Sequence, residues 1–434
     1  MTSEIRDLRI HHRRLGDLAP FANNARTHSP KQIRQIAESI KVFGWTNPIL
    51  TDGKDGIIAG HGRLEAARLL GMDMVPTISL SDMTESQKRA YIIADNKLAE
   101  NAGWDDSILE IELGELAGME LGFDLEAIGF ETGEIDVMLG AGDAASEAPP
   151  PEPAKGQPIS APGDLWILGE HKLLCGDALA PESYQRLLEA ETAAAMFTDP
   201  PYNVPVHGHV CGLGKVRHGE FVMASGEMTD KQFRDFLETF CQRASQSLKP
   251  GAVAFVCMDW RHIDDLLEAG EANLGELINF CVWNKMQGGM GSLYRSQHEL
   301  VPVFRTPGAG HRNNVELGRH GRNRTNVWDY KGVQARRDEL KLHPTVKPIA
   351  MIADAIQDVT ARGELILDPF AGSGSTILAA EQTGRKARCL ELDPRYVGVA
   401  IRRYEEATGK EAEHAIWGQS FNEIEAERKE AEDV

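Results

Sequence analysis

The stretch that decides the fold runs from residue 365 to residue 376 and reads Leu365-Ile366-Leu367-Asp368-Pro369-Phe370-Ala371-Gly372-Ser373-Gly374-Ser375-Thr376. An apolar run, two glycines and two hydroxyl side chains predict a buried strand, a tight turn and the start of a helix. Gly372 and Gly374 permit positive φ and a close approach of the main chain to a ligand. Ser375 or Thr376 can cap the helix. Taken alone, this pattern fits a tight turn that binds no ligand equally well.

A second apolar run, Ala387–Leu390, follows the predicted helix and ends at Glu391. In nucleotide-binding βαβ units, an acidic residue roughly 20 residues past the glycine turn binds the ribose hydroxyls. Glu391 stands close to this spacing. The two runs together therefore predict a nucleotide-binding βαβ unit.

A short string with two prolines, Asp199-Pro200-Pro201-Tyr202, follows a further apolar run at residues 193–198. Successive prolines keep Asp199 and Pro200 out of the α region, so the backbone here is extended and stiff. We expect the Asp199 carboxylate and the Pro200 carbonyl to point outward as two hydrogen-bond acceptors, with the Tyr202 ring beside them. An amino group on a planar base offers two hydrogens and a face for stacking, so the string is typical of a reader of such a group.

From about Asp164 to its end, the chain resembles the S-adenosylmethionine-dependent DNA amino-methyltransferases of the beta order, in which the catalytic string precedes the glycine turn. Shorter pieces that resemble the same family are Cys175-Gly176-Asp177, Lys249-Pro250-Gly251, Trp283-Asn284-Lys285 and residues 343–348. The resemblance implies an α/β fold with a Rossmann-like methyltransferase sheet, and catalysis by Asp199, Pro200, Pro201 and Tyr202.

The same resemblance implies a site for S-adenosyl-L-methionine. In it Asp177 contacts the adenine of the cofactor, Glu391 binds the ribose, and Lys347 with its neighbours closes the methionine end. The full set of cofactor-binding residues that the resemblance implies is Asp177, Thr198, Lys347, Pro348, Asp368, Phe370, Ala371, Gly372, Ser373, Gly374, Glu391 and Leu392.

The implied reaction is methyl transfer to N6 of a flipped adenine in double-stranded DNA, because Asp rather than Ser stands at position 199. N4 of cytosine stays open as an alternative target. RNA and a protein glutamine are further alternatives, but the glutamine enzymes carry Asn at this position, and a basic insertion favours duplex DNA. An alternative of another class is a partition-like DNA-binding or nuclease protein with an accessory methyltransferase domain.

Charge is segregated along the chain, whose net charge is −20. Residues 98–154 carry fifteen acidic side chains and no Lys or Arg, whereas residues 285–348 carry twelve Lys and Arg against five acids. A basic stripe suits a surface that follows phosphates, and a solvated basic loop is the plain alternative. We interpret residues of about 305–342 as the target-recognition region. Arginine suits bidentate base readout, so the expected DNA contacts are Arg312, Arg319, Arg322 and Arg324.

The first 145 residues form a different unit. Ser29-Pro30 predicts the start of a helix, residues 47–51 and 56–59 predict short strands, and the turn at residues 60–62 leads into another helix. Over about residues 6–101 this unit resembles the ParB/sulfiredoxin nucleotide-binding fold, a smaller α+β domain, as in prophage-type ParB-domain methyltransferases. Gly60, His61 and Arg63 match at the helix N-terminus where a phosphate would lie.

This resemblance makes a nucleoside triphosphate a candidate partner of the N-terminal unit, where it would gate formation of a homodimer. The plain alternative is that Arg63 only begins an amphipathic helix. The tract that follows leads into acidic helices rather than a basic helix-turn-helix, which argues against partition-site binding. The acidic tract from Glu100 to Glu152 is the expected contact surface if the unit docks a partner instead.

The remaining chain predicts a Pro-rich linker at residues 146–163, between the N-terminal unit and a methyltransferase domain at residues 164–434. No apolar run approaches transmembrane length, and the N-terminus lacks a signal region, so we expect a cytoplasmic protein without a membrane partner. The six cysteines lack metal spacing and are expected to be inert thiols. We expect no metal, and we interpret the Gly- and His-rich residues 203–228 as a loop over the flipped base.

Two helices are also predicted in this domain. Thr229 caps one whose apolar face runs from Phe233 to Leu248. Residues 423–434 are expected to form a charged, solvated helical tail.

Overall fold

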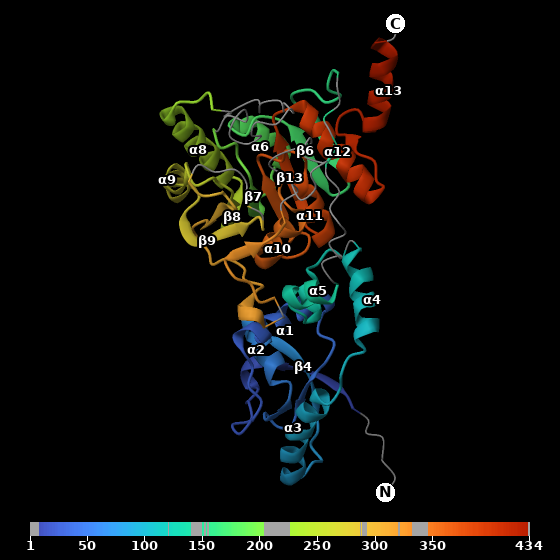
Figure 1. Cartoon of the computed structure of the whole chain (residues 1–434). Helices are drawn as coiled ribbons and strands as arrows, with labels where there is room; N and C mark the ends of the chain where they lie inside the picture. The colour runs from blue at the N-terminus through green and yellow to red at the C-terminus, as the bar shows by residue number, and fades with distance from the viewer. Residues whose placement is uncertain are drawn as a thin grey trace. The chain divides into compact units, whose positions relative to one another are not determined.

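The computed structural model describes residues 8–119, 121–139, 150, 151, 153, 156–203, 226–286, 288, 293–319, 322–331 and 346–432. The chain divides into two compact units, Met1–Leu139 and Gly140–Val434 (Figure 1). Several expected features lie outside the described residues. These are the interior of the loop at 203–228, most of the linker at 146–155, Cys211, residues 343–345, and residues 332–342 of the recognition region.

The first unit is an α+β domain around a four-stranded sheet of order β1-β4-β2-β3. Its strands are β1 (Ile10–Arg14), β2 (Ile49–Thr51), β3 (Ile57–Ala59) and β4 (Met74–Ser79). Its helices are α1 (Pro30–Phe43), α2 (His61–Leu69), α3 (Glu85–Glu100), α4 (Asp106–Ala117) and α5 (Thr132–Met138). The expected start of α1 is confirmed, since the Ser29 side chain accepts a hydrogen bond from the Gln32 backbone N–H.

The second unit is built on a ten-stranded sheet of order β11-β9-β10-β8-β7-β12-β13-β6-β5-β14. Strands β8, β7, β12, β13 and β6 run parallel to one another in its centre, and the flanking strands β10 and β5 pair antiparallel with β8 and β6. The strands are β5 (Leu165–Leu168), β6 (His171–Cys175), β7 (Ala193–Thr198), β8 (Leu248–Val256), β9 (Glu276–Asn284), β10 (His298–Arg305), β11 (Val327–Asp329), β12 (Leu365–Asp368), β13 (Lys386–Glu391) and β14 (Glu413–His414).

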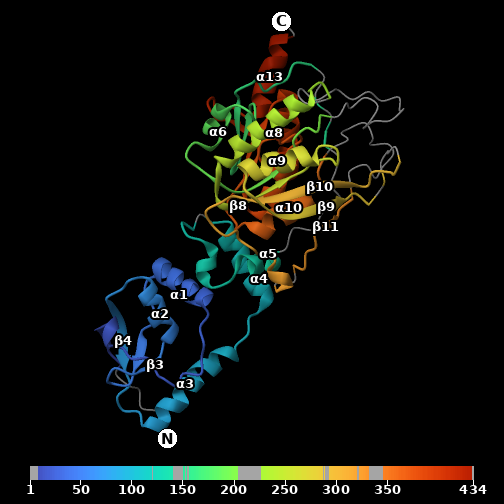
Figure 2. The ribbon, with the colours of Figure 1, turned by 90° about the vertical axis from the view of Figure 1, so that its left-hand side faces the viewer.

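Helices cover both faces of this sheet (Figure 2). One apolar cluster packs α6, α8 and α9 onto one face, and another packs α10, α11, α12 and the start of α13 onto the opposite face. The helices are α6 (Pro181–Leu188), α8 (Asp230–Ser245), α9 (Ile263–Asn273), α10 (Ile349–Val359), α11 (Ser375–Thr383), α12 (Pro394–Thr408) and α13 (Phe421–Glu432). A parallel sheet covered on both sides is the Rossmann-like α/β arrangement expected from the sequence.

The order of the strands brings two distant motifs together. Strand β7 carries the Asp199 string at its carboxyl end, and β12 carries the glycine turn at its own. The two strands are parallel neighbours, with Ile366 opposite Ala195. In open α/β sheets ligands bind outside the carboxyl ends of the strands, so this edge of the sheet positions the candidate site.

Three local expectations need correction. Leu248 does not continue α8 but begins β8, although its side chain stays in the same apolar cluster. Helix α11 is preceded by Gly374 in the left-handed region, and no side chain caps it. The C-terminal helix is not fully solvated, because Phe421 and Ile424 in its first turn are buried in the core.

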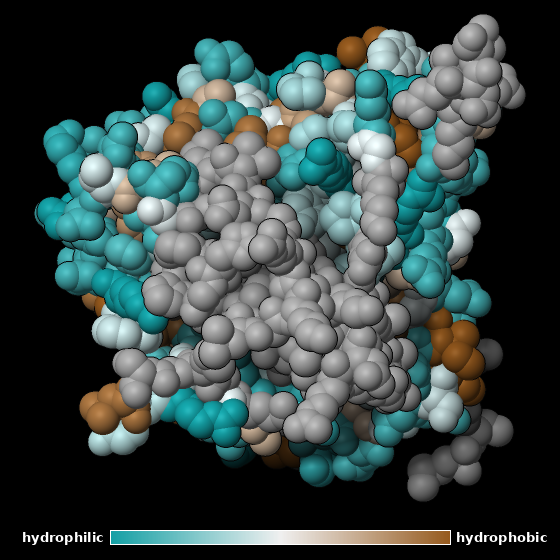
Figure 3. Space-filling view, turned by 45° about the horizontal axis from the view of Figure 1, so that its top comes forward, coloured by the Kyte–Doolittle hydropathy of each residue, from teal (hydrophilic) through white to brown (hydrophobic). Residues whose placement is uncertain are grey.

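On the face shown in Figure 3, most of the described residues are hydrophilic, and the apolar residues lie in small groups. Among the helices that the structure describes, none has the length and apolar content needed to span a bilayer. Five cysteines fall in the described ranges, and all five are buried and unpaired, as expected. Within the same ranges, no group of three or more His, Cys, Asp or Glu side chains is arranged to hold a metal ion.

Candidate active site

Asp368 connects the ends of the two central strands. Its buried carboxylate accepts hydrogen bonds from the Thr198 hydroxyl at 2.9 Å, from the Thr376 hydroxyl at 2.6 Å and from the Phe370 backbone N–H at 3.1 Å. Burial raises the pKa of Asp368 to about 6 against these three donors. The carboxylate thereby ties the end of β7 to the glycine turn and to the first turn of α11.

The glycine turn is built on positive φ at both expected glycines, 51° at Gly372 and 80° at Gly374. A Cβ at Gly374 would lie 2.8 Å from the Cβ of Ala400, so this glycine permits α11 and α12 to approach closely. A Cβ at Gly372 would meet no atom within 4 Å. Gly374 therefore serves packing, whereas the space beside Gly372 is open.

Glu391, at the end of β13, faces this turn. Its carboxylate accepts the Gly372 N–H and the Asp393 N–H, each at 2.8 Å. Burial raises the pKa of Glu391 to about 7. Each of its oxygens keeps a lone pair for a further donor, so the side chain is held by the main chain in a fixed position from which it can accept hydroxyls.

The catalytic string lies at the end of β7. Its Tyr202 hydroxyl donates to the Asp199 carboxylate, and the Lys347 ammonium donates to the other oxygen of the same carboxylate. Burial raises the pKa of Asp199, against the opposing effect of Lys347. Two donors on two oxygens fix the plane of the carboxylate.

A second carboxylate, Glu299 on β10, lies behind this string. It accepts the Lys347 ammonium at 3.0 Å and, at 3.2 Å, shares the single proton of the Tyr202 hydroxyl with Asp199, and its other oxygen accepts the Lys285 ammonium. Burial opposes ionisation of Glu299, but the two lysines outweigh it and lower its pKa to about 2. Lys347 is itself buried, and the carboxylates of Asp199 and Glu299 hold its pKa above the ordinary value.

A cavity of about 170 Å³ opens at the carboxyl ends of β7, β12 and β13. All four residues of the catalytic string line it. The expected cofactor residues that also line it are Asp177, Lys347, Asp368, Phe370, Ala371, Gly372, Ser373, Glu391 and Leu392. Thr198, Pro348 and Gly374 lie outside its lining. Of these, Thr198 acts through its hydrogen bond to Asp368.

Several lining or supporting residues escaped the sequence analysis. Asp393, Tyr396 and Thr376 line the cavity, and Thr376 binds Asp368 rather than capping α11. Glu299 and Lys285 support the catalytic string. A signal for Glu299 was present, since a carboxylate directly precedes the apolar residues 300–304 of β10.

Asn203 follows the catalytic string and brings together the two ends of the adjoining loop. It adopts positive φ, 53°, and its side-chain oxygen accepts the backbone N–H of Gly226 at 3.1 Å and of Met228 at 3.2 Å. Its side-chain amide donates to the Met228 carbonyl at 2.9 Å. The segment expected to cover the flipped base therefore starts and ends beside Tyr202.

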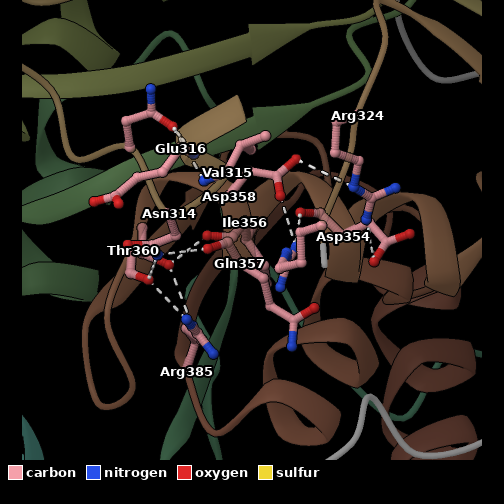
Figure 4. A network of polar contacts seen from close by, with 12 residues as sticks. Asn314, Val315, Glu316, Arg324, Asp354, Ile356, Gln357, Asp358, Thr360 and Arg385 are labelled. Atoms are coloured by element: carbon pink, nitrogen blue, oxygen red, sulfur yellow. Dashed lines mark hydrogen bonds and ion pairs between the residues drawn. The ribbon is translucent and has the colours of Figure 1, made fainter. Parts of the chain in front are cut away.

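Residues 322–324, in the segment that the sequence analysis interpreted as the target-recognition region, are fastened to α10. Arg322 forms an ion pair with Asp358 at 2.6 Å and donates to the Asp354 carbonyl. Arg324 forms ion pairs with Asp354 and Asp358 and donates to the Tyr330 hydroxyl at 2.8 Å. Figure 4 shows Arg324 beside these two carboxylates.

The same network holds Asn314. Its amide donates to the carbonyls of Gln357 and Thr360 at 2.7 and 2.9 Å (Figure 4). Arg319, in contrast, is more than half exposed and pairs with Glu316. Of the four expected DNA contacts, Arg322 and Arg324 therefore face α10, and Arg319 faces solvent.

The turn at residues 60–62 leads into a helix as expected, although α2 already begins at His61 within that turn. Gly60 precedes α2 with a φ of 100°. The His61 Nε2 accepts the Phe21 backbone N–H at 3.2 Å, and burial lowers the pKa of His61, with a further contribution from His28. Arg63 is half-buried, and its buried Nε has no hydrogen-bond partner among the described residues.

A doubly covered α/β sheet, with an Asp-Pro-Pro-Tyr string and a glycine turn at neighbouring carboxyl ends, defines the class of amino-methyltransferases. Residues 193–402 match the family of N6/N4 DNA methylases. Residues 3–97 match the ParB N-terminal domain, and residues 107–162 match the ParB-methyltransferase helix-turn-helix domain. The chain therefore belongs to the DNA methylases that carry these two ParB-type domains, and it is a DNA methyltransferase of the N6/N4 family. The helix-turn-helix match spans α4 and α5, in the acidic tract where the sequence argued against a basic motif.

Three curated relatives match different parts of the chain. The ParB-like nuclease domain-containing protein YnaK of Escherichia coli is 58% identical over 82 residues, which cover 19% of this chain and 94% of YnaK. The type II methyltransferase M.HpaI of Haemophilus parainfluenzae is 25% identical over 252 residues, covering 54% of this chain and 74% of its own. The DNA adenine methyltransferase YhdJ of Escherichia coli is 39% identical over 88 residues, covering 20% and 30%.

Proposed function

We propose that this methyltransferase transfers a methyl group from S-adenosyl-L-methionine to N6 of an adenine flipped out of duplex DNA, in the cytoplasm. The observation that carries the proposal is that the Asp199 string, the glycine turn and Glu391 line the same cavity. Glu391 accepts hydrogen bonds from the ribose hydroxyls of the cofactor. The open space beside Gly372 accommodates the cofactor. The sulfonium methyl supplies the transferred group.

The target base must leave the duplex, because its N6 is paired there and the nitrogen lone pair is delocalised into the ring. Asp199 and the Pro200 carbonyl accept the two N6 hydrogens, which turns the lone pair toward the methyl group. Tyr202 stacks on the flipped ring. Asp199 need not be a strong base, because the proton leaves after methyl transfer.

Adenine is favoured over cytosine by two observations. Asp stands at position 199, and the relative YhdJ, a DNA adenine methyltransferase, is 39% identical over its matching 88 residues. N4 of cytosine is the alternative target. Incubation of the protein with S-adenosyl-L-methionine and mixed-sequence duplex DNA, followed by single-molecule sequencing, identifies the modified base and its context. N6-methyladenine at a fixed sequence is expected. N4-methylcytosine would show that cytosine is the target base instead, and unmodified DNA would contradict the proposal.

We further propose that the recognition region contacts DNA through Arg312, Arg319, Arg322 and Arg324. Removing the charge of Arg319 is expected to weaken DNA binding and to lower the salt slope by about one. At least one of the four charge-removing changes is expected to relax the recognised sequence, as base readout requires. Binding assays at several salt concentrations measure the affinity and the salt slope. Sequencing of methylated sites measures the recognised sequence. Uniform weakening with an unchanged site would instead make this region a backbone contact.

The partners of Arg324 provide a matched control for this prediction. If Arg324 acts by fastening the region to α10, DNA affinity falls in both Arg324→Gln and Asp354→Asn. If its guanidinium contacts DNA instead, Asp354→Asn frees a positive charge and raises affinity. The proposed DNA contact predicts opposite directions, and a loss of affinity in both variants would instead assign Arg324 to fastening the region to α10.

For the first unit, we propose that the turn at Gly60, His61 and Arg63 binds a nucleoside triphosphate, which gates formation of a homodimer. Backbone N–H groups at a helix N-terminus and an unpartnered guanidinium nitrogen suit a phosphate. Arg63→Ala is expected to abolish binding in calorimetric titrations of the full chain with the four triphosphates. Arg68→Ala, in the exposed ion pair with Glu65 on the same helix, is the control. If none of the four nucleotides binds, the unit is instead a docking domain for a partner or DNA.

A further inference from the structure

Glu299 is a buried carboxylate that neither the glycine turn nor the cofactor residues explain. It lies near the start of β10, with only 7% of its surface exposed, and faces the catalytic string across the sheet. Neighbouring β10 side chains such as Val301 and Val303 are apolar core residues. A charge in this position is costly unless it is fully paired, and Glu299 is paired with two lysines and a hydroxyl.

Those three partners connect Glu299 to the orientation of Asp199. The Lys347 ammonium has three protons, and it has one acceptor for each of them, on Asp199, Glu299 and the Tyr202 hydroxyl at 3.3 Å. The Tyr202 hydroxyl in turn lies between the same two carboxylates. Both donors that fix the plane of the Asp199 carboxylate are therefore themselves held by Glu299.

We propose that Glu299 is a positioning residue for methyl transfer: together with Lys285, it holds Lys347 and Tyr202 so that the Asp199 carboxylate is correctly oriented before the base enters. The proposal rests on the proposed role of Asp199 as acceptor of the amino group. Glu299 does not line the cavity and acts only through these two neighbours. Its loss thus affects the chemical step rather than the binding of either substrate.

Because charged groups surround Asp199, changing them is expected to change the pH dependence of the methyl-transfer rate. The groups that face Asp199 are Lys347, Tyr202 and Glu299, and the more distant Cys257 and Asp368 interact with it electrostatically. Glu299→Gln removes a negative charge, so the pKa of Asp199 falls and the acid limb of the rate profile moves to lower pH. Lys285→Met leaves Glu299 less compensated, so the pKa of Asp199 rises and the limb moves to higher pH.

The experiment is single-turnover methylation between pH 5 and 8 with DNA and S-adenosyl-L-methionine both saturating. Under these conditions the acid limb reports groups in the ternary complex. Glu299→Gln is expected to lower the maximal rate by about 100-fold, as for a misplaced reacting group, with the dissociation constants of both substrates unchanged. The two acid limbs are expected to move in opposite directions, each by about one pH unit.

Two comparisons keep the test sharp. Glu276→Gln removes a carboxylate that pairs with Arg305 across the same two strands but is exposed and far from the cavity lining, so it is expected to behave as wild type. Lys285→Met removes a partly exposed side chain, so it disturbs the fold less than Glu299→Gln. If Glu299→Gln lowers stability, the acid limb of Lys285→Met tests the role of Glu299. Unshifted limbs, or limbs that move in the same direction, would overturn the role of Glu299. The wild-type rate and product test the proposed function separately.

Discussion

Replacing Asp199 by alanine is expected to lower methyl transfer to DNA by at least about 10³-fold, while S-adenosyl-L-methionine binds within about twofold of wild type. The reason is a separation of tasks within one cavity. Asp199 directly follows β7 and faces Lys347 and Tyr202, whereas the turn at Gly372 follows β12 and Glu391 ends β13. Radiolabel transfer to DNA and calorimetric titration of the cofactor measure the two effects.

The control for this change is Asp235→Ala, which removes an exposed carboxylate paired with Lys231 on α8. Asp199→Asn is a useful companion because it keeps the shape of the side chain and reduces the disturbance of the buried Lys347. Wild-type turnover by Asp199→Ala would refute the assignment of the catalytic string. A loss of cofactor binding in Asp199→Asn would show that the two tasks are not separate.

Replacing Gly372 by valine is expected to have the converse effect, with cofactor affinity falling by at least about 100-fold. The added side chain points into space that is open in the cavity, since no atom lies within 4 Å of its Cβ position. A φ of 51° also disfavours a β-branched residue, at a cost of about 1–2 kcal/mol. DNA binding, measured without cofactor, is expected to change little.

Gly363→Val separates the steric effect from the strain. Gly363 has a φ of 78° and also nothing within 4 Å of its Cβ position, but it lies outside the cavity lining. It therefore carries a comparable backbone cost without obstructing the site. Equal loss of cofactor binding in both variants would assign the effect to strain, and normal binding by Gly372→Val would remove the glycine turn from the cofactor site.

The sequence predicted those parts of the molecule that depend on local chemistry. The strand before Asp368, the positive φ of Gly372 and Gly374, and the capping of α8 by Thr229 all follow from neighbouring residues, and all three are present. The same local signals predicted a βαβ unit, and the family resemblance implied the α/β class. The family resemblance supplied the order of the two motifs.

Long-range pairing could not be predicted in the same way. Glu299 meets Lys347 only because β10, β8 and β7 are neighbours in the sheet, and no periodicity in β10 reveals that contact. The attachment of Arg322 and Arg324 to α10 likewise depends on carboxylates more than 25 residues away. Arginine in this segment predicted contact with bases, and the same residue type serves equally well to fasten a loop.

The two edge strands β5 and β14 have a consequence for the evolution of the domain. They pair antiparallel, with Trp166 opposite His414 and Ile167 opposite Glu413, so the beginning and the end of the methyltransferase unit lie side by side. Chains whose ends are adjacent tolerate circular permutation. The site itself requires only that β7 and β12 be neighbours, whichever comes first along the gene. Joining these ends and opening the chain at another surface turn would exchange the order of the two motifs while preserving the cavity between them.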